Sequence, residues 1–418
     1  MEKLKRVVVT GLGALTPIGN NVEEYWNSLI AGKSGAGPIT HFDATPFKTR
    51  FACEVKGFDA SLLIPRQELR KMDRYSQYAI AVAEECMVDS KLNLATEDTR
   101  RIGVVWGTGI GGIETFEEEI ISYAKNPEMP RFSPFFITKM IANMASGAIS
   151  IRYGLRGTSF TTVSACTSSN HAIGEAYNTI RLGKANVILA GGSEASVTHS
   201  ALGGFSSMKA ISERNDSPET ASRPFDVSRD GFVIGEGGAA LMLEELDHAL
   251  ARGAKIYAEL VGYGSASDAY HITASHPDGD GAVQAMQEAM DEAGIKPSQV
   301  NYINAHGTST PVGDISECKA ISRVFAETLP TVVVGSTKSM TGHMLGGAGA
   351  AEAIAAILAI KNDIIPPTIN LTELDPKIDS AIVFSRGKAI SKQVEVAMNN
   401  TFGFGGHIGV TLFKKFKG

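Results

Sequence analysis

Short apolar runs alternate with helical stripes along the whole chain. Apolar and β-branched runs of strand length occupy residues 7–10, 102–106, 160–163, 186–190, 239–243, 254–262, 301–305 and 332–335. Between two of them, Ile173, Ala176, Tyr177 and Ile180 recur at i, i+3, i+4 and i+7, which predicts an amphipathic helix. An alanine-rich helix is predicted over residues 348–360. Regular alternation of strands and helices indicates an α/β fold.

The pattern also suggests a division of the chain into two parts. Gly253 ends a helical stretch, and a new strand-like run follows it directly. We therefore predict an N-terminal half over residues 1–253 and a C-terminal half over 254–418. Residues 265–281 have little periodicity and are expected to form a long loop over a site. Residues 399–407, which are rich in glycine and carry Phe402 and Phe404, are expected to form a flexible loop.

Composition narrows the class of protein. The 418 residues are 43% hydrophobic, and the net charge of −6 gives no general attraction to nucleic acid or anionic membranes. Four scattered cysteines without a Cys-x-x-Cys pair make a disulfide framework or a zinc site unexpected, so we expect a reducing, cytoplasmic location. Residues 1–6 run straight into the first strand and leave no room for a signal peptide. The alanine-rich helix is short and contains Glu352, so no membrane span is expected.

Cys166 lies at a predicted strand-to-helix elbow. The small residues Ser164 and Ala165 precede it, and Thr167 and Ser168 are good first-turn residues of a helix. The positive end of a helix lowers the pKa of a thiol, and the free amide groups there can hold an oxyanion. Such a cysteine is a candidate nucleophile. The alternative is a small buried residue without a chemical role.

Two glycine-rich stretches resemble nucleotide-binding loops. The first, residues 11–17, fails the fingerprint because Thr16 stands where the third glycine belongs. The second, residues 107–112, has the right spacing but precedes a helix that opens with Glu114 and Glu117, an unfavourable surface for a pyrophosphate. Tight turns are the preferred interpretation of both.

The second half supplies further polar groups at strand ends. His306 follows one strand, and Lys338 and His343 follow another in a glycine-bounded loop. Strand ends of open α/β sheets collect catalytic groups. A metal site is disfavoured because the ligands are not clustered. A Cys–His hydrolase needs one histidine as base, whereas two histidines suit neutral imidazoles that donate to a developing oxyanion. Other histidines, including His171, are interpreted as satisfied structural residues.

A basic cluster stands out on this acidic chain. Arg66, Arg70, Lys71 and Arg74 lie within nine residues, and Lys125, Arg131 and Lys209 are further candidates for a positive rim. A solvated helix face is the simpler explanation. A docking surface for an acidic partner is the alternative.

Four motifs together resemble a known family. They are Ser-Ala-Cys-Thr-Ser-Ser at 164–169, Asn-Ala-His-Gly-Thr-Ser-Thr at 304–310, Ser-Thr-Lys-Ser-Met-Thr-Gly-His at 336–343 and Thr-Phe-Gly-Phe-Gly-Gly at 401–406. In this order they resemble the elongating β-ketoacyl-acyl carrier protein synthases, most closely synthase II of type II fatty-acid synthesis. The resemblance implies a thiolase fold, in which two similar βαβαβαββ halves form a five-layered αβαβα core. It also implies a homodimer.

The resemblance assigns roles to the candidate residues. Cys166, His306 and His343 become a catalytic triad for the decarboxylating Claisen condensation of malonyl-acyl carrier protein with an acyl chain on Cys166. Lys338 with Glu352 would organise His343, and the amide groups of Cys166 and Phe404 would hold an oxyanion. No metal or dissociable cofactor is implied, because substrates arrive on the phosphopantetheine arm of acyl carrier protein.

The same resemblance implies the binding surfaces. Phe404 would act as a mobile gate. The residues expected to contact substrate are Thr308 and Thr310 in the pantetheine tunnel, Ile110, Phe205 and Phe402 around the acyl pocket, and Phe135 and Phe136 from across the dimer. The residues expected to dock the acidic carrier protein are Arg66, Arg70, Lys71, Arg131 and Lys209.

Two departures and several alternatives accompany the resemblance. Gly406-His-Ile-Gly replaces the common Gly-Thr-Asn after the gate, and Ser169-Asn-His replaces smaller residues after the nucleophile, which is expected to alter the acyl-pocket entrance. The leading alternative is a ketosynthase of a polyketide or aryl-polyene pathway. A chain-length factor is disfavoured by Cys166, and thiolases and initiating synthases by the loop that holds His343. A non-catalytic carrier-protein-binding scaffold is the alternative from another class.

Overall fold

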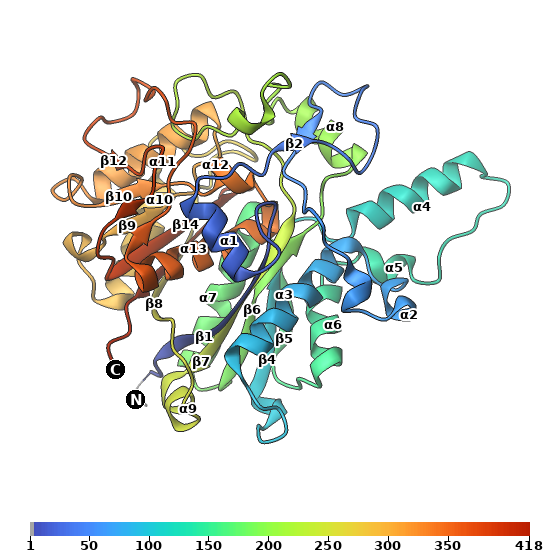
Figure 1. Cartoon of the computed structure of the whole chain (residues 1–418), viewed down its shortest axis with the longest axis horizontal. Coiled ribbons are helices and arrows are strands. Elements are labelled where there is room, and N and C mark those ends of the chain that lie inside the picture. Colours follow the sequence, from blue (N-terminus) through green and yellow to red (C-terminus); the bar gives the residue numbers. More distant parts are fainter. Residues whose placement is uncertain (1–3) are drawn as a thin grey trace.

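Two halves with the same order of elements make up the computed structural model, which describes residues 4–418 (Figure 1). Residues 1–3, part of the segment predicted to hold no signal peptide, lie outside the described residues. The N-terminal half contains β1 (Val7–Leu15), α3 (Arg74–Ser90), β4 (Ile102–Gly107), α6 (Met144–Tyr153), β5 (Ser159–Thr162), α7 (Ser168–Arg181), β6 (Val187–Glu194) and β7 (Gly237–Glu245). The C-terminal half contains β8 (Ala258–Ser267), α10 (Asp280–Ala293), β9 (Tyr302–Asn304), α11 (Pro311–Val324), β10 (Val333–Gly335), α13 (Ala348–Asn362), β14 (Val396–Gly403) and β15 (His407–Lys414). Each half is therefore a βαβαβαββ unit, as the resemblance implies.

Sheet topology repeats between the halves. The strand order is β5-β4-β6-β7-β1 in one and β10-β9-β14-β15-β8 in the other, so each half places its strands in the order third, second, fourth, fifth, first. The two sets join edge to edge, because β1 pairs antiparallel with β8 from Val7↔Leu260 to Val9↔Ala258. The result is one 11-stranded sheet, completed by β12 (Val383–Phe384).

Helices form three layers around this sheet. The central helices α7 and α13 contact strands of both halves: α7 packs on β4, β6 and β15, and α13 on β6, β7 and β14. The outer helices α3 and α6 cover the N-terminal strands, and α10 and α11 cover the C-terminal ones. The five-layered αβαβα core is confirmed. The remaining elements are α1 (Val22–Ile30), α2 (Arg66–Leu69), α4 (Ile113–Lys125), α5 (Phe136–Met140), α8 (His199–Ser207), α9 (Leu246–Ala251), α12 (Lys338–Thr341), β2 (Gly37–Pro38), β3 (Phe51–Ala52), β11 (Ile364–Ile365) and β13 (Ile390–Ser391).

Glycines in the first strand of each half let an outer helix pack closely. A Cβ on Gly13 of β1 would lie 2.0 Å from the Val82 oxygen on α3, and one on Gly264 of β8 would lie 1.9 Å from the Ala285 oxygen on α10. The expectation that residues 11–17 follow the first strand is thus wrong, because β1 continues to Leu15. These glycines serve helix-to-sheet contact rather than a turn.

Three further boundaries differ from the sequence-based expectation. β6 runs through Gly191 and Gly192, which were expected to follow that strand. The loop expected over 265–281 spans 268–279, between β8 and α10. The flexible loop expected over 399–407 is mostly the hairpin β14–β15, whose turn covers only 404–406. In each case ladder pairing extends the strand beyond its local pattern. β6 and β8 pair with strands distant in sequence, whereas the end of β14 pairs with its hairpin partner β15.

The apolar helix α13 lies in the centre of the molecule. Leu345–Asn362 is long and apolar enough to cross a membrane by length and composition, but 89% of that stretch is buried inside the protein. Its alanines and isoleucines pack among β7, β14 and α7. The hydrophobicity of this segment is thus accounted for by its place between the two halves.

Candidate active site

Cys166 lies at the elbow that the sequence predicts. β5 ends at Thr162, a 3₁₀ turn covers Ala165–Thr167, and α7 starts at Ser168. Ala165 has a φ of 51°, a left-handed conformation that is costly for a residue with a Cβ. The backbone N–H groups of Phe404 and of Cys166 itself face the sulfur. The elbow therefore presents the thiol beside two amide donors.

The ionisation of Cys166 differs from the expectation. Burial raises the pKa of the thiol to about 12, although the Lys338 charge and the two amide groups act in the opposite direction. The expectation of a lowered pKa is wrong because desolvation of the thiolate outweighs the helix terminus at this depth. The resting thiol is protonated at neutral pH.

His306 and His343 lie next to each other. Their ring centroids are 5.4 Å apart and the rings are perpendicular. Burial, followed by the nearby charge of Lys338, lowers the pKa of each well below the usual value. Both imidazoles are therefore neutral at pH 7.

Lys338 fixes the tautomer of His306. Its Nζ lies 3.4 Å from His306 Nδ1, and it forms a buried ion pair with Glu352. An ammonium only donates hydrogen bonds, so Nδ1 accepts and the proton of the imidazole resides on Nε2. The sequence-based expectation paired Lys338 with His343, whereas the structure places it against His306.

His343 is held through its backbone and its ring face. Its N–H donates to the Val233 oxygen at 2.7 Å, and its carbonyl accepts from Gly235 at 2.8 Å. Its ring packs edge-on against Phe232, with centroids 5.3 Å apart. These contacts come from residues between α8 and β7, so the N-terminal half positions a histidine of the C-terminal half.

One cavity of about 300 Å³ brings the candidate groups together. Thr308 and Thr310 line it and hydrogen-bond to each other at 3.0 Å. Phe402 packs on His306 with centroids 5.4 Å apart. The sequence-predicted residues that line this cavity are Cys166, His306, His343, Thr308, Thr310, Phe205, Phe402, Phe404 and Lys209.

Other predicted residues lie away from the cavity. Ile110 is 41% exposed, and its N–H donates to Glu194. Phe135 and Phe136 lie on a projecting arm, residues 113–140, in which Phe136 stacks on Phe116 and Phe132 (Figure 1). In the single chain these two rings do not reach the thiol.

The predicted basic residues are all exposed, but they are dispersed. Arg66, Arg70 and Lys71 lie on and just after α2, Arg131 lies in the arm, and Lys209 lies at the cavity. Lys71 pairs with Glu68 at 2.8 Å. Arg74, part of the sequence cluster, instead turns inward toward Glu114 and Glu236.

Glu194 is a buried site residue that sequence reasoning missed. Its carboxylate accepts from the N–H of Gly109 at 2.6 Å, of Ile110 at 3.2 Å and of Gly346 at 3.0 Å. It therefore occupies the amide groups of the glycine-rich loop that resembles a nucleotide site. It also ties that loop to the turn that follows His343.

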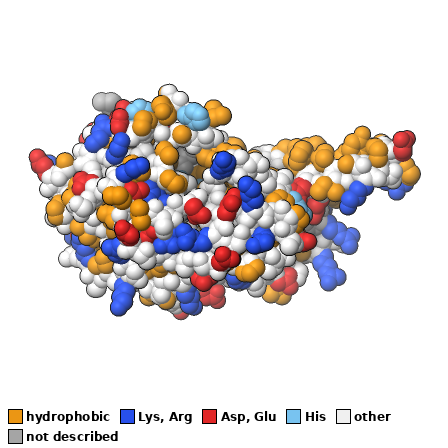
Figure 2. Space-filling model, turned by 90° about the horizontal axis from the view of Figure 1, so that it is seen from above, with side chains coloured by type: hydrophobic (Ala, Val, Ile, Leu, Met, Phe, Trp, Pro, Cys, Tyr) orange, Lys and Arg blue, Asp and Glu red, His pale blue; other side chains and the backbone are white. Residues whose placement is uncertain are grey.

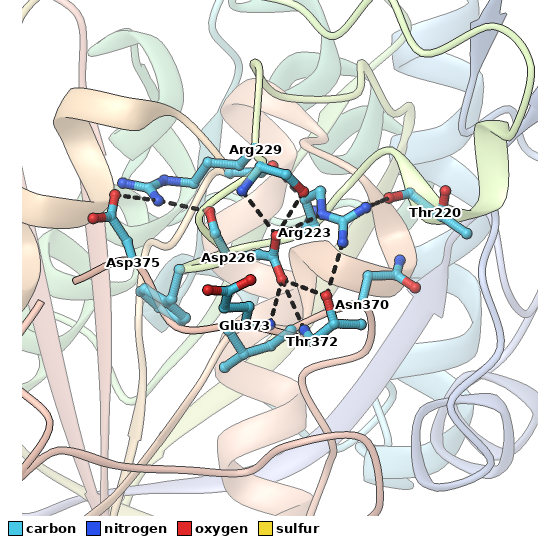
Figure 3. A network of polar contacts seen from close by, with 12 residues as sticks. Thr220, Arg223, Asp226, Arg229, Asn370, Thr372, Glu373 and Asp375 are labelled. Carbon is cyan, nitrogen blue, oxygen red and sulfur yellow. Dashed lines mark hydrogen bonds and ion pairs between the residues drawn. The ribbon is translucent and has the colours of Figure 1, made fainter. Parts of the chain in front are cut away.

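Sequence reasoning also missed a buried ionic network that includes Arg223, Asp226, Arg229 and Asp375 (Figure 3). It supports the threonine wall of the cavity, which Thr308 and Thr310 form. Arg229 donates to the carbonyls of Thr310 at 3.1 Å and Pro311 at 2.8 Å, and to Asp375 at 2.8 Å. Ser309, between the two threonines, has a φ of 69° and accepts from the Arg223 N–H at 3.0 Å. The network thus holds a strained turn that carries Thr308 and Thr310.

Asp226 connects the same network to the loop after β11. One carboxylate oxygen accepts from Arg223 and Ser228, and the other from the N–H groups of Thr372 and Glu373 (Figure 3). These hydrogen bonds lower the pKa of Asp226, so the carboxylate is charged at neutral pH. No local sequence pattern indicates this pairing, because its partners are about 146 residues apart.

Family models match both halves of the chain. The model for the Beta-ketoacyl synthase, N-terminal domain covers residues 4–249, and that for the Beta-ketoacyl synthase, C-terminal domain covers 257–372. The chain belongs to the β-ketoacyl synthase family. A 3-oxoacyl-[acyl-carrier-protein] synthase 2 of Synechocystis is 49% identical to this β-ketoacyl synthase over 100% of the chain and 99% of the relative. One from Staphylococcus aureus is 48% identical over the full length of both.

A solved structure is similar to this β-ketoacyl synthase, and the match covers 99% of the present chain and 100% of the chain in the solved structure. It is a type II polyketide-synthase acyl-carrier protein in complex with its ketosynthase bound to the hexaketide, and the matched chain has a TM-score of 0.90 and 33% identity.

Within residues 4–418 of the β-ketoacyl synthase described here, no group of three or more His, Cys, Asp or Glu side chains is arranged to hold a metal ion.

Proposed function

We propose that this β-ketoacyl synthase elongates acyl chains by decarboxylating Claisen condensation, as a 3-oxoacyl-acyl carrier protein synthase of the synthase II type. The observation that carries the proposal is the convergence of Cys166, His306 and His343 on one cavity. The chain is 48–49% identical to synthase 2 relatives over their full length, and 33% identical to the ketosynthase of the polyketide complex. The higher identity supports fatty-acid rather than polyketide elongation.

In the first half-reaction, the Cys166 sulfur attacks the carbonyl carbon of an acyl thioester on the carrier arm. The oxyanion accepts from the N–H groups of Cys166 and Phe404, the two donors that face the sulfur. The C–S bond to the arm then breaks, and the thiol proton of Cys166 leaves with the pantetheine sulfur. The acyl group remains on Cys166.

In the second half-reaction, malonyl-acyl carrier protein loses CO2 and leaves an enolate. The Nε2–H of His306, fixed by Lys338 at Nδ1, donates to the enolate oxygen, and neutral His343 is the second donor. The enolate carbon attacks the acyl carbonyl on Cys166, the cysteine thiolate departs, and a proton from water restores the resting thiol. The product is a β-ketoacyl-acyl carrier protein that is two carbons longer.

The partners we propose follow from the same chemistry. Substrates arrive on acyl carrier protein, so no dissociable cofactor is required, and Lys209 at the cavity, with Arg66, Arg70, Lys71 and Arg131, steers that acidic partner. The structure similar to this chain includes a carrier protein bound to its ketosynthase, which supports the proposal. The four free, buried cysteines support a reducing location, and we place the enzyme in the cytoplasm.

We propose a homodimer through the free edge of β5. This strand ends the sheet. Phe160 in the strand is 37% exposed, and Val163 directly after it is 58% exposed. Apolar side chains also follow the projecting arm (Figure 2). An unpaired and exposed sheet edge favours pairing with a second copy. The exposed apolar residues of the arm are Phe116, Ile120, Ile121, Tyr123, Met129, Phe132, Phe135 and Ile137.

Mass analysis of the protein tests the activity. Purified protein is incubated with acyl-acyl carrier protein, digested and searched for an acyl adduct. We expect the adduct on the peptide that contains Cys166, and no adduct in Cys166→Ala. Transfer to another residue would refute Cys166 as the nucleophile. No transfer under conditions where the carrier protein binds would favour a non-catalytic scaffold.

A further inference from the structure

The first turn of α7 is joined to the hairpin β14–β15 by side chains that the mechanism does not use. Asn170 is fully buried and donates to the carbonyl of Gly409 at 2.8 Å and to Thr401 Oγ1 at 3.0 Å. Ser169 Oγ accepts from the Ala350 N–H at 3.0 Å. The expectation that residues 169–171 alter the acyl-pocket entrance is therefore wrong, because they face the hairpin and α13 instead.

His171 is the member of this group that reaches from one functional element to another. Its Nδ1 lies 2.7 Å from Ser164 Oγ, two residues before the nucleophile. Its Nε2 lies 3.1 Å from the carbonyl oxygen of Ile408, in the hairpin strand that follows Phe404. One imidazole thus connects the elbow that carries Cys166 with the hairpin that carries Phe404.

The chemistry of its partners fixes the protonation of His171. A carbonyl oxygen only accepts, so Nε2 carries the proton and donates to Ile408. Nδ1 of the neutral ring then accepts from the Ser164 hydroxyl. Burial and the neighbouring His407 lower the pKa of His171, so the ring stays neutral and both hydrogen bonds persist at pH 7.

The surrounding backbone leaves little room for the two elements to shift. A Cβ on Gly403 would lie 2.6 Å from the Ser164 oxygen and 3.3 Å from the Cys166 nitrogen. A Cβ on Gly409 would lie 3.0 Å from Cδ2 of His171. The hairpin and the elbow are in direct contact, and His171 bridges them beside that contact.

We infer that His171, with Ser164, is a positioning residue that sets the separation of the two amide donors facing the Cys166 sulfur. One donor, the N–H of Cys166, belongs to the elbow, and the other, the N–H of Phe404, belongs to the hairpin. A donor that is displaced from the developing oxyanion loses much of its stabilising effect. The inference rests on the proposed function, because it concerns the acyl-transfer step.

The test measures the two half-reactions separately in His171→Ala, Ser164→Ala and the double variant. Acyl transfer to Cys166 should fall roughly tenfold in each single variant, less than the loss of about 10²–10³ when an oxyanion donor is removed outright. Malonyl decarboxylation should change by less than about threefold, because the enolate is held by the histidines and not by these amides. The double variant should be no slower than His171→Ala, since both residues belong to one connection.

Two further substitutions each remove one of the two hydrogen bonds that His171 makes to Ser164 and Ile408. His171→Gln keeps a donor near the Nε2 position but no acceptor for Ser164, and His171→Asn keeps an acceptor near Nδ1 but does not reach Ile408. If both bonds are needed, each behaves like His171→Ala. Wild-type acyl transfer in either variant would overturn the bridge.

His248→Ala is the matched control. His248 is also bonded through both ring nitrogens, to Glu244 at 2.6 Å and Glu97 at 3.0 Å, but it lies on α9 and does not line the cavity. Equal losses in both half-reactions, additive losses in the double variant, or losses matched by His248→Ala would contradict the positioning role. Failure of the wild-type protein to acylate Cys166 would instead refute the proposed function.

Discussion

At the scale of single residues, burial controls the ionisation of the reactive groups. It raises the pKa of Cys166 to about 12 and lowers that of His306 and His343 well below 6.5. Alkylation of Cys166 by iodoacetamide should therefore speed up about tenfold per pH unit from pH 7 to 10, because only the thiolate reacts. Peptide mass analysis measures this rate, with Cys166→Ala as the control. A rate of alkylation that levels off by pH 8 would show that the helix terminus lowers the pKa of Cys166 more than burial raises it.

The buried histidines also predict a pH dependence of stability. Each is neutral when folded, whereas the unfolded chain takes up a proton below about pH 6.5. Their contribution is therefore complete above pH 6.5 and is lost as the pH falls, by at most about 1.4 kcal/mol per pH unit for each group. Urea unfolding at pH 7, 6 and 5 should show a smaller decline for His343→Gln than for the wild type. Equal slopes would mean that His343 is protonated in the folded protein.

At the scale of elements, the threonine wall depends on Arg229. Lysine keeps the charge, but its single ammonium does not span the carbonyls of Thr310 and Pro311 together with Asp375. Arg229→Lys should relax the strained turn at Ser309 and raise the KM for acyl-acyl carrier protein by roughly three- to tenfold, with kcat changed less. Steady-state kinetics test this expectation.

Arg6→Lys provides the comparison for that prediction. Arg6 is likewise paired with a carboxylate, to which it makes two hydrogen bonds (Glu259, both at 2.7 Å), but it lies at the surface and away from the cavity. Its kinetics should match the wild type. An unchanged KM in Arg229→Lys, or an equal change of KM in Arg6→Lys, would show that the Arg229 network does not support substrate binding.

At the scale of the whole molecule, the free edge of β5 predicts association. Val163→Asp places a charge beside this exposed edge and should shift the mass in solution from twice 44.3 kDa toward 44.3 kDa. Light scattering after size-exclusion chromatography measures it. Leu62→Asp, at a residue that is 82% exposed on a 3₁₀ turn, is the control. A wild-type protein of 44.3 kDa would contradict the dimer.

The local sequence pattern predicts the helices and strands of this fold, and long-range packing determines how they pair. The stripe of Ile173, Ala176, Tyr177 and Ile180 predicts α7 because all four residues face the core. The edge joint between β1 and β8 has no local signal, because its partners are about 250 residues apart. For the same reason the duplication of the two halves follows from resemblance rather than from periodicity.

The same distinction between local pattern and long-range contact applies to the candidate site. The positions of Cys166, His306 and His343 at ends of elements follow from local sequence. The tautomer of His306, the thiol pKa and the roles of Glu194 and Arg229 depend on contacts with residues distant in sequence. A charge count along the chain does not reveal which arginine is buried.

Separate measurement of the two half-reactions in His306→Ala and His343→Ala tests the central claim most directly. Acyl transfer to Cys166 is followed by peptide mass, and decarboxylation of malonyl-acyl carrier protein by release of labelled CO2. We predict that both variants still form acyl-Cys166 within about tenfold of the wild-type rate and lose about 10²-fold or more in decarboxylation, because the imidazoles stabilise only the enolate. Equal loss of both half-reactions, or retained decarboxylation, would contradict the division of labour between the sulfur and the two histidines.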